Sequence, residues 1–165
     1  MAGARSTGFS EFPDAFLASS ENAKNVYRRS DTHFAVHGRK SLPGATIELK
    51  SEKIAVYPIN RRSDFSEAVQ STPVYVLHPG GRIAIPTGRV FVRLAPNERF
   101  QDLAESFRHA GYEIVETVPY ATNAGWVRSA TSSIASALAG LPRLAGLSVV
   151  ENVEPQMLVE TVRRN

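Results

Sequence analysis

The chain has 165 residues, of which 42% are hydrophobic and 21% charged, so it is long and apolar enough to bury a core in one domain or two small ones. It contains no cysteine, which excludes disulfides, thiolate metal sites and cysteine nucleophiles. The net charge is only +3 and the basic residues occur as short doublets, not as one basic patch, so nucleic acid is not among the partners that we expect.

The first thirty residues are polar and rich in small side chains, and we expect a flexible arm over residues 1–30. Apolar residues recur at helical spacing between Asp14 and Tyr27, which predicts one short helix in this arm. No secretory signal and no membrane-spanning run is visible, since a span needs about 18 apolar residues. As written, the sequence predicts a cytoplasmic protein with no membrane partner, or an extracytoplasmic one if the chain is excised from a longer precursor.

Residues 31–86 have the pattern of a small β-rich region. Short runs of β-branched and aromatic residues predict strands at His33–Val36, Thr46–Leu49 and Ile54–Tyr57. The segment from Pro73 to Pro86 predicts a hairpin, because two apolar runs flank a Pro-Gly-Gly turn.

Residues 87–155 show the clearest periodicity in the chain. In order along the chain, the pattern predicts a strand at Val90–Leu94, a helix at Phe100–Phe107 that ends at Gly111, strands at Tyr112–Val118 and Trp126–Arg128, a helix capped by Ser132 or Ser133, and a strand at Ser148–Val153. This order predicts an α+β fold, a ferredoxin-like βαββαβ sandwich with helices on one sheet face and the other face open. The small β-rich region would precede it, either as a domain of its own or as a cover for the open sheet face.

The sequence contains little that resembles a catalytic site. The four histidines, His33, His37, His78 and His109, lack the spacing of metal-binding motifs. No serine lies in the motif of an activated nucleophile, and no glycine pattern matches a phosphate-binding loop. We therefore expect no enzyme, no catalytic residues, no metal and no cofactor.

Several segments of the second half resemble the N-terminal propeptide of subtilisin-like serine proteases. The run Thr87–Leu94 is similar to the opening strand of those propeptides, and Arg108–Ile114 to their helix end and returning strand. Leu138–Pro155 is similar to their closing helix and strand, which ends in a Glu-Pro pair. The hairpin Val74–Ile85 resembles a β extension found before this module in some larger bacterial subtilases. The resemblance spans about Pro73 to Pro155.

This resemblance implies a protein-binding function as an inhibitor and folding chaperone of a subtilisin-like serine protease. In that family the sheet docks on two surface helices of the enzyme, and the C-terminal tail lies in the active-site cleft like a substrate. The carboxylates expected to cap helices of the partner are Glu151 and Glu154. The tail residues expected in the cleft are Gln156, Met157, Leu158, Val159, Glu160, Thr161, Val162, Arg163, Arg164 and Asn165.

A second hypothesis is an interaction or assembly module that does not depend on a protease. Its open sheet face would pair with a structural partner or with a second copy of the chain, so a homo-oligomer is left open. A third hypothesis is a nucleic-acid binder that uses the basic doublets, and it predicts binding that collapses with added salt. The first two hypotheses differ in what they predict for a protease. The first predicts inhibition that requires residues 156–165, and the second predicts a stable complex without inhibition.

Overall fold

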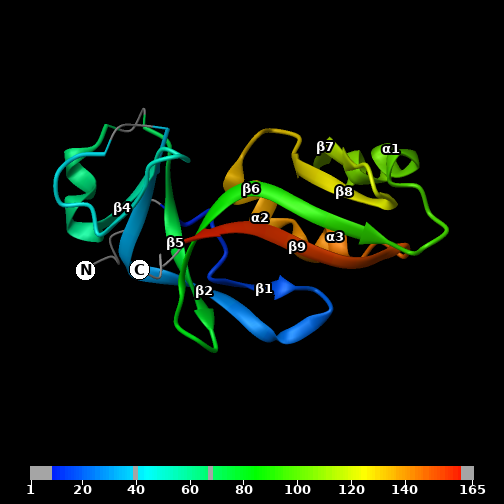
Figure 1. Cartoon of the computed structure of the whole chain (residues 1–165), viewed down its shortest axis with the longest axis horizontal. Helices are drawn as coiled ribbons and strands as arrows, with labels where there is room; N and C mark the ends of the chain where they lie inside the picture. Colours follow the sequence, from blue (N-terminus) through cyan, green and yellow to red (C-terminus); the bar gives the residue numbers. More distant parts are fainter. Residues whose placement is uncertain (1–8, 39–40, 67–68, 161–165) are drawn as a thin grey trace.

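The computed structural model describes residues 9–38, 41–66 and 69–160, which form one long, mostly antiparallel sheet with a few short helices (Figure 1). The strands are β1 (Ala15–Ser19), β2 (Asn22–His37), β3 (Ile47–Leu49), β4 (Ile54–Pro58), β5 (Ser71–His78), β6 (Ile83–Leu94), β7 (Tyr112–Val118), β8 (Ala121–Ser129) and β9 (Val150–Val159). The helical segments are η1 (Ile59–Asp64), η2 (Phe100–Leu103), α1 (Ala104–His109), α2 (Ile134–Ala139) and α3 (Leu141–Ala145).

Strand β6 connects the two halves of the sheet. The hydrogen-bonded order is β3-β4-β2-β5-β6-β8-β7, with β1 paired to β2 and β9 paired to β6. The first part of β6 pairs with β5 at Ala84, and the second part pairs with β8 from Arg89 to Arg93. Strand β9 follows β6 from Ala84 to Leu94, so it contacts both halves (Figure 1).

The predicted fold class, an α+β ferredoxin-like βαββαβ sandwich preceded by a small β-rich region, is wrong. The nine strands of the described residues form one antiparallel sheet, and the helices are few and short. The boundary predicted between residues 86 and 87 falls inside β6. The Thr87–Gly88 pair looked like a break between elements, but Gly88 takes a φ of +91° within a continuous strand. The register with β9 shifts between Pro86 and Val90, so an irregularity bends β6 without ending it.

The short helix predicted between Asp14 and Tyr27 is also wrong, because this segment forms β1 and the first part of β2. The physical reason is the burial of Phe16, which is 8% exposed. Its ring lies 4.7 Å from the ring of Tyr75 and 5.5 Å from that of Tyr27. Tertiary packing of one aromatic side chain thus outweighs a weak helical periodicity. Residues 1–8 of the predicted flexible arm lie outside the described residues.

The local strand predictions in the β-rich region are confirmed. The runs at His33–Val36, Thr46–Leu49 and Ile54–Tyr57 fall on β2, β3 and β4. The predicted hairpin is formed by β5 and β6, which pair at Tyr75 and Ala84. In its turn, Gly80 and Gly81 take positive φ angles, as a tight connection after a proline requires.

The main core lies between the second half of the sheet and the helices. Val90, Val92 and Leu94 of β6 are fully buried against side chains from η2, α1, α2 and α3. Helix α2 begins at Ser133, whose hydroxyl accepts a hydrogen bond from the backbone N–H of Ser136 at 3.1 Å, which confirms one of the two predicted caps. Because side chains alternate along a strand, Phe91 and Arg93 of β6 point to the opposite face of the sheet.

Candidate functional site

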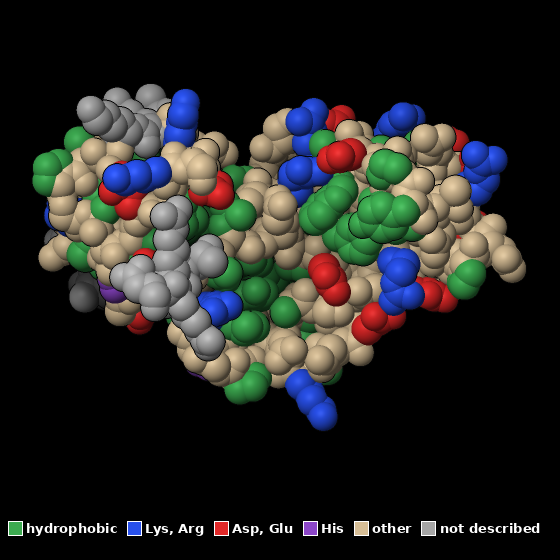
Figure 2. Space-filling model, in the orientation of Figure 1, with side chains coloured by type: hydrophobic (Ala, Val, Ile, Leu, Met, Phe, Trp, Pro, Cys, Tyr) green, Lys and Arg blue, Asp and Glu red, His purple; other side chains and the backbone are tan. Residues whose placement is uncertain are grey.

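An aromatic pair occupies the sheet face that the helices do not cover. Phe91 of β6 lies directly opposite Trp126 of β8 in the strand register. Their rings meet edge to face with centroids 5.3 Å apart, and both side chains are only partly buried. Figure 2 shows the resulting hydrophobic patch over the region where β6 runs in Figure 1, with acidic and basic side chains around it. We call this surface, with the charged residues that border it, the aromatic face.

Two arginines border the aromatic face on the side of β7. The guanidinium of Arg89 lies 4.8 Å from the centroid of the Trp126 ring, and its Nη2 atom is 2.7 Å from Oε2 of Glu116. The neighbouring Arg128 bonds Oε1 of Glu113 through its Nε atom at 2.6 Å. These cross-strand ion pairs balance the charge of two arginines that lie opposite each other. The cation–π contact also fixes the orientation of the Trp126 ring.

The opposite border is formed by Arg93, by two carboxylates of β9 and by Glu21 of the turn between β1 and β2. Arg93 bonds Glu151 at 3.0 Å and is also ion-paired with Glu21. Glu154 lies opposite Phe91 in the register of β6 and β9, and its Oε1 atom accepts a hydrogen bond of 2.9 Å from Asn152. The aromatic pair is therefore flanked by both positive and negative side chains.

The aromatic face combines a pair of aromatic rings with a border of arginines and carboxylates. Aromatic residues and arginine are the residue types that interfaces concentrate, and a border of polar and charged groups is typical of them. In the described part of the chain, no group of three or more His, Asp and Glu side chains is placed to bind a metal ion. The face therefore offers apolar packing area and ion-pairing groups.

The structure places the two predicted helix-capping carboxylates beside the aromatic face. Glu151 is engaged with Arg93, whereas Glu154 is exposed next to Phe91. Of the two, only Glu154 keeps its carboxylate outside an ion pair among the described residues.

The first part of the predicted tail belongs to the sheet. Gln156, Met157, Leu158 and Val159 are the last residues of β9, and Met157, Leu158 and Val159 pair with β6. The side chain of Gln156 also accepts a hydrogen bond of 2.8 Å from the Thr87 hydroxyl. Glu160 follows the strand and is exposed. The remaining predicted tail residues, Thr161, Val162, Arg163, Arg164 and Asn165, lie outside the described residues.

Sequence reasoning missed Phe91 and Trp126 as the centre of a site. The alternation along β6 already places Phe91 on the face opposite Val90 and Val92. What the sequence lacks is the register between β6 and β8, which brings Trp126 beside Phe91. Trp126 is the only tryptophan in the chain, and a lone tryptophan is a weak indication of a binding site.

The comparisons with known proteins give no further guidance. No protein-family model matches the chain, and neither a curated protein nor a solved structure is similar to it at a significant level. Within residues 9–160, apart from the short gaps, no helix is long and apolar enough to cross a membrane.

Proposed function

We propose that the chain is a non-enzymatic protein-binding module that docks on its partner through the aromatic face. The observation that carries this proposal is the partly exposed Phe91–Trp126 pair on the sheet face that the helices do not cover. Burying such a pair in an interface removes a large apolar area from water, and aromatic residues are frequent hot spots of binding. The face is held by strands and ion pairs, so little conformational entropy is lost on docking.

The partner that we propose is a subtilisin-like serine protease, for which the chain would act as an inhibitor or chaperone. The resemblance of Thr87–Leu94 and Leu138–Pro155 to propeptides of that family motivates this choice. The geometry is compatible with it, because helices on the partner would meet an apolar centre and a charged border. Glu154 would accept hydrogen bonds from the N-terminus of a partner helix, and Glu151 would need to exchange its bond with Arg93 to do so.

Replacing the aromatic pair tests this proposal directly. The double variant Phe91→Ala/Trp126→Ala is expected to weaken inhibition of a responsive subtilisin-like protease at least about 30-fold, the effect of losing a hot spot of 2 kcal/mol. The inhibition constant is measured against a panel of such proteases, with circular dichroism to confirm folding. Tyr120→Ala is the matched control, because Tyr120 is an aromatic residue that is 90% exposed in the turn after β7. Equal inhibition by wild type and the double variant would contradict docking through this face.

Truncation tests the proposed role of the C-terminal residues. Removing residues 160–165 leaves β9 complete, so the fold is expected to persist while inhibition falls if these residues occupy the cleft. Removing residues 156–165 also deletes Met157 and Leu158, which pack against two of the buried clusters, and is expected to lower the melting temperature. Melting curves and inhibition constants of the two truncations separate these effects. Unchanged inhibition after the shorter truncation would exclude a tail in the cleft.

The alternative is an assembly module that binds a structural partner or a second copy through the same face. The border carries both signs of charge, as the ion pairs of Arg89 and Arg93 show, so a second copy could meet it without net repulsion. Light scattering of the intact chain decides between the two. A stable oligomer that Trp126→Ala dissociates, together with no inhibition of any protease in the panel, would favour the alternative.

A further inference from the structure

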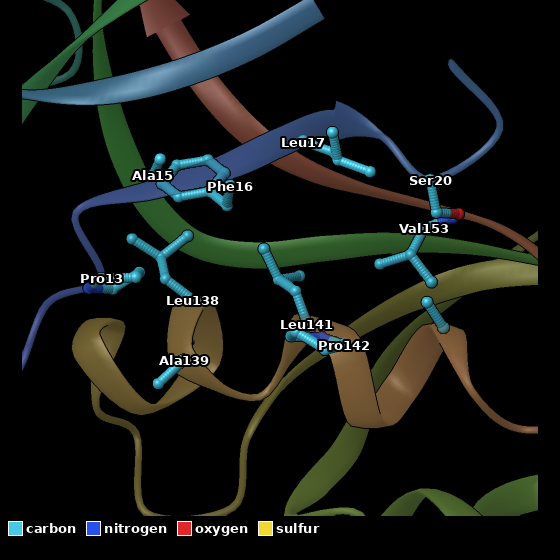
Figure 3. Close-up of a pocket in the computed structure, with 11 residues that line it drawn as sticks. Pro13, Ala15, Phe16, Leu17, Ser20, Leu138, Ala139, Leu141, Pro142 and Val153 are labelled. Carbon is cyan, nitrogen blue, oxygen red and sulfur yellow. The ribbon is translucent and has the colours of Figure 1, made fainter. Parts of the chain in front are cut away.

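A cavity of about 270 Å³ that is partly open to solvent lies between β1 and the helices α2 and α3, on the side of the sheet away from the aromatic face (Figure 3). Figure 3 shows the side chains of Phe16, Leu138 and Leu141 between the strand above and the helices below. The residues that line it are Pro13, Ala15, Phe16, Leu17, Ser20, Leu138, Ala139, Leu141, Pro142, Ala145 and Val153.

The lining is almost entirely apolar. Its single polar side chain is Ser20, whose hydroxyl donates to Oδ1 of Asn152 at 3.2 Å and accepts from the backbone N–H of Val153 at 2.8 Å. That hydroxyl is therefore already bonded within the protein. No charged side chain lines the cavity, so a charged group inside it would lose its hydration without gaining a counter-ion.

Strand β1 is fixed at both ends, which keeps the cavity from closing. At one end the backbone N–H of Ser20 donates to the carbonyl oxygen of Val153 at 3.0 Å. At the other end the carbonyl oxygen of Asp14 accepts from the backbone N–H of Arg29 at 2.8 Å, and the Tyr75 hydroxyl donates to the carbonyl oxygen of Pro13 at 2.9 Å. The strand cannot approach the helices without breaking these bonds. The space is thus part of the folded structure.

We propose that this cavity binds an uncharged apolar small molecule, an alkyl or aryl compound of about ten carbon atoms. A closed apolar cavity of about 150 Å³ binds benzene, and this cavity, although open to solvent at Ala15, Leu17, Ala139 and Pro142, offers a larger apolar volume to a hydrocarbon group. The lining offers no free polar group to the backbone N–H and C=O groups of a peptide, which favours a small apolar molecule as the occupant. The site is separate from the aromatic face and does not depend on the proposed function.

Toluene is the first probe, with benzoate as its charged counterpart of similar size. Titration of toluene into the labelled protein is expected to shift the methyl resonances of Leu138, Leu141 and Val153 and to give a saturable dissociation constant. Benzoate is expected to bind at least about tenfold more weakly, because its carboxylate finds no cation in the lining. No saturable shift of these methyl groups by toluene, or equal affinity for benzoate, would overturn the proposal.

A variant with a larger side chain on α3 tests the location of the site, because that side chain would fill the cavity. Ala145→Leu adds an apolar side chain to the lining and is expected to weaken toluene binding at least about tenfold. Ala104→Leu is the control, since Ala104 is also helical and partly buried but lies on α1, outside the cavity lining. If Ala145→Leu does not fold, Leu17→Phe fills the same space from β1. Toluene affinity unchanged in a folded filling variant would overturn the location of the site.

Discussion

Replacing Gly125 with alanine is expected to destabilise the protein by about 2–3 kcal/mol, the cost of overpacking a core. Gly125 lies in β8 between β6 and β7, where it pairs with Val92 and Thr117. A Cβ atom at this position would lie 2.6 Å from Cδ1 and 2.7 Å from Cζ of Phe100. The Phe100 ring is 1% exposed and packs against Phe107, so moving it away from the new Cβ atom would disturb a buried aromatic contact. Urea unfolding of wild type and variant measures the loss.

A double-variant cycle isolates this steric cause. Phe100→Leu removes the ring that the new methyl group would meet, so Gly125→Ala is expected to cost at least about 1 kcal/mol less in the Phe100→Leu background. Apart from this clash, Gly125→Ala would stabilise the folded state, because alanine restricts the unfolded chain more than glycine does. Equal costs in the two backgrounds would show that the glycine is required for a reason other than the Phe100 ring.

The elements that could be predicted from the sequence are those fixed by local patterns. The alternation of Val90, Val92 and Leu94 identifies a strand with one buried face, and the cap at Ser133 marks the start of α2. These features depend on residues close in sequence. They are correct even though the fold class is wrong. Residues close in sequence determine whether a segment is a strand or a helix, whereas contacts between distant residues determine which strands pair.

The sheet itself could not be predicted because it depends on contacts between distant residues. The pairing of Ala84 with both Tyr75 and Val159 joins the two halves of the chain, and no local pattern indicates it. Gly88 illustrates the difficulty. A glycine with positive φ usually marks a turn, and here it bends a strand that continues. Likewise, the burial of Phe16 against Tyr75 converts a predicted helix into a strand.

The candidate site was predictable only in part. The sequence indicated an open sheet face and named Glu151 and Glu154, which do lie at its border. It did not identify Phe91 and Trp126 as partners, because their contact depends on the register between β6 and β8. It also treated Gln156 as the start of a free tail, since the pairing of β9 with β6 beyond Pro155 follows from the same long-range register.

His37 gives the folded protein a pH dependence of its own. This residue is the last of β2, and its Nε2 atom is hydrogen-bonded to the hydroxyl of Thr72 at 2.9 Å. Burial disfavours the charged imidazolium and lowers the pKa of His37 from 6.5 to about 4. Thr72 is 1% exposed, so the pair lies within the sheet structure and away from the aromatic face. The neutral imidazole is therefore the form that the fold stabilises.

The sign of the effect follows from the depressed pKa. Above pH 6.5 the histidine is neutral in both folded and unfolded chains and contributes no pH dependence. As the pH falls from 6.5 toward 4, the unfolded chain binds a proton at His37 while the folded chain does not, so stability is lost. The expected loss from this group between neutral pH and pH 4 is up to about 3 kcal/mol.

The variant His37→Gln separates this loss from the titration of carboxylates. Glutamine can bond the Thr72 hydroxyl and does not titrate, so the variant is expected to lose up to about 3 kcal/mol less than wild type on acidification to pH 4. The measurement is the free energy of unfolding in urea at several pH values between 7.5 and 4 for both proteins. The difference between the two curves should develop below pH 6.5, because only the wild-type unfolded chain takes up the additional proton there. Parallel curves would mean that His37 is protonated as readily in the folded chain as in the unfolded one, which would contradict its burial as the dominant influence.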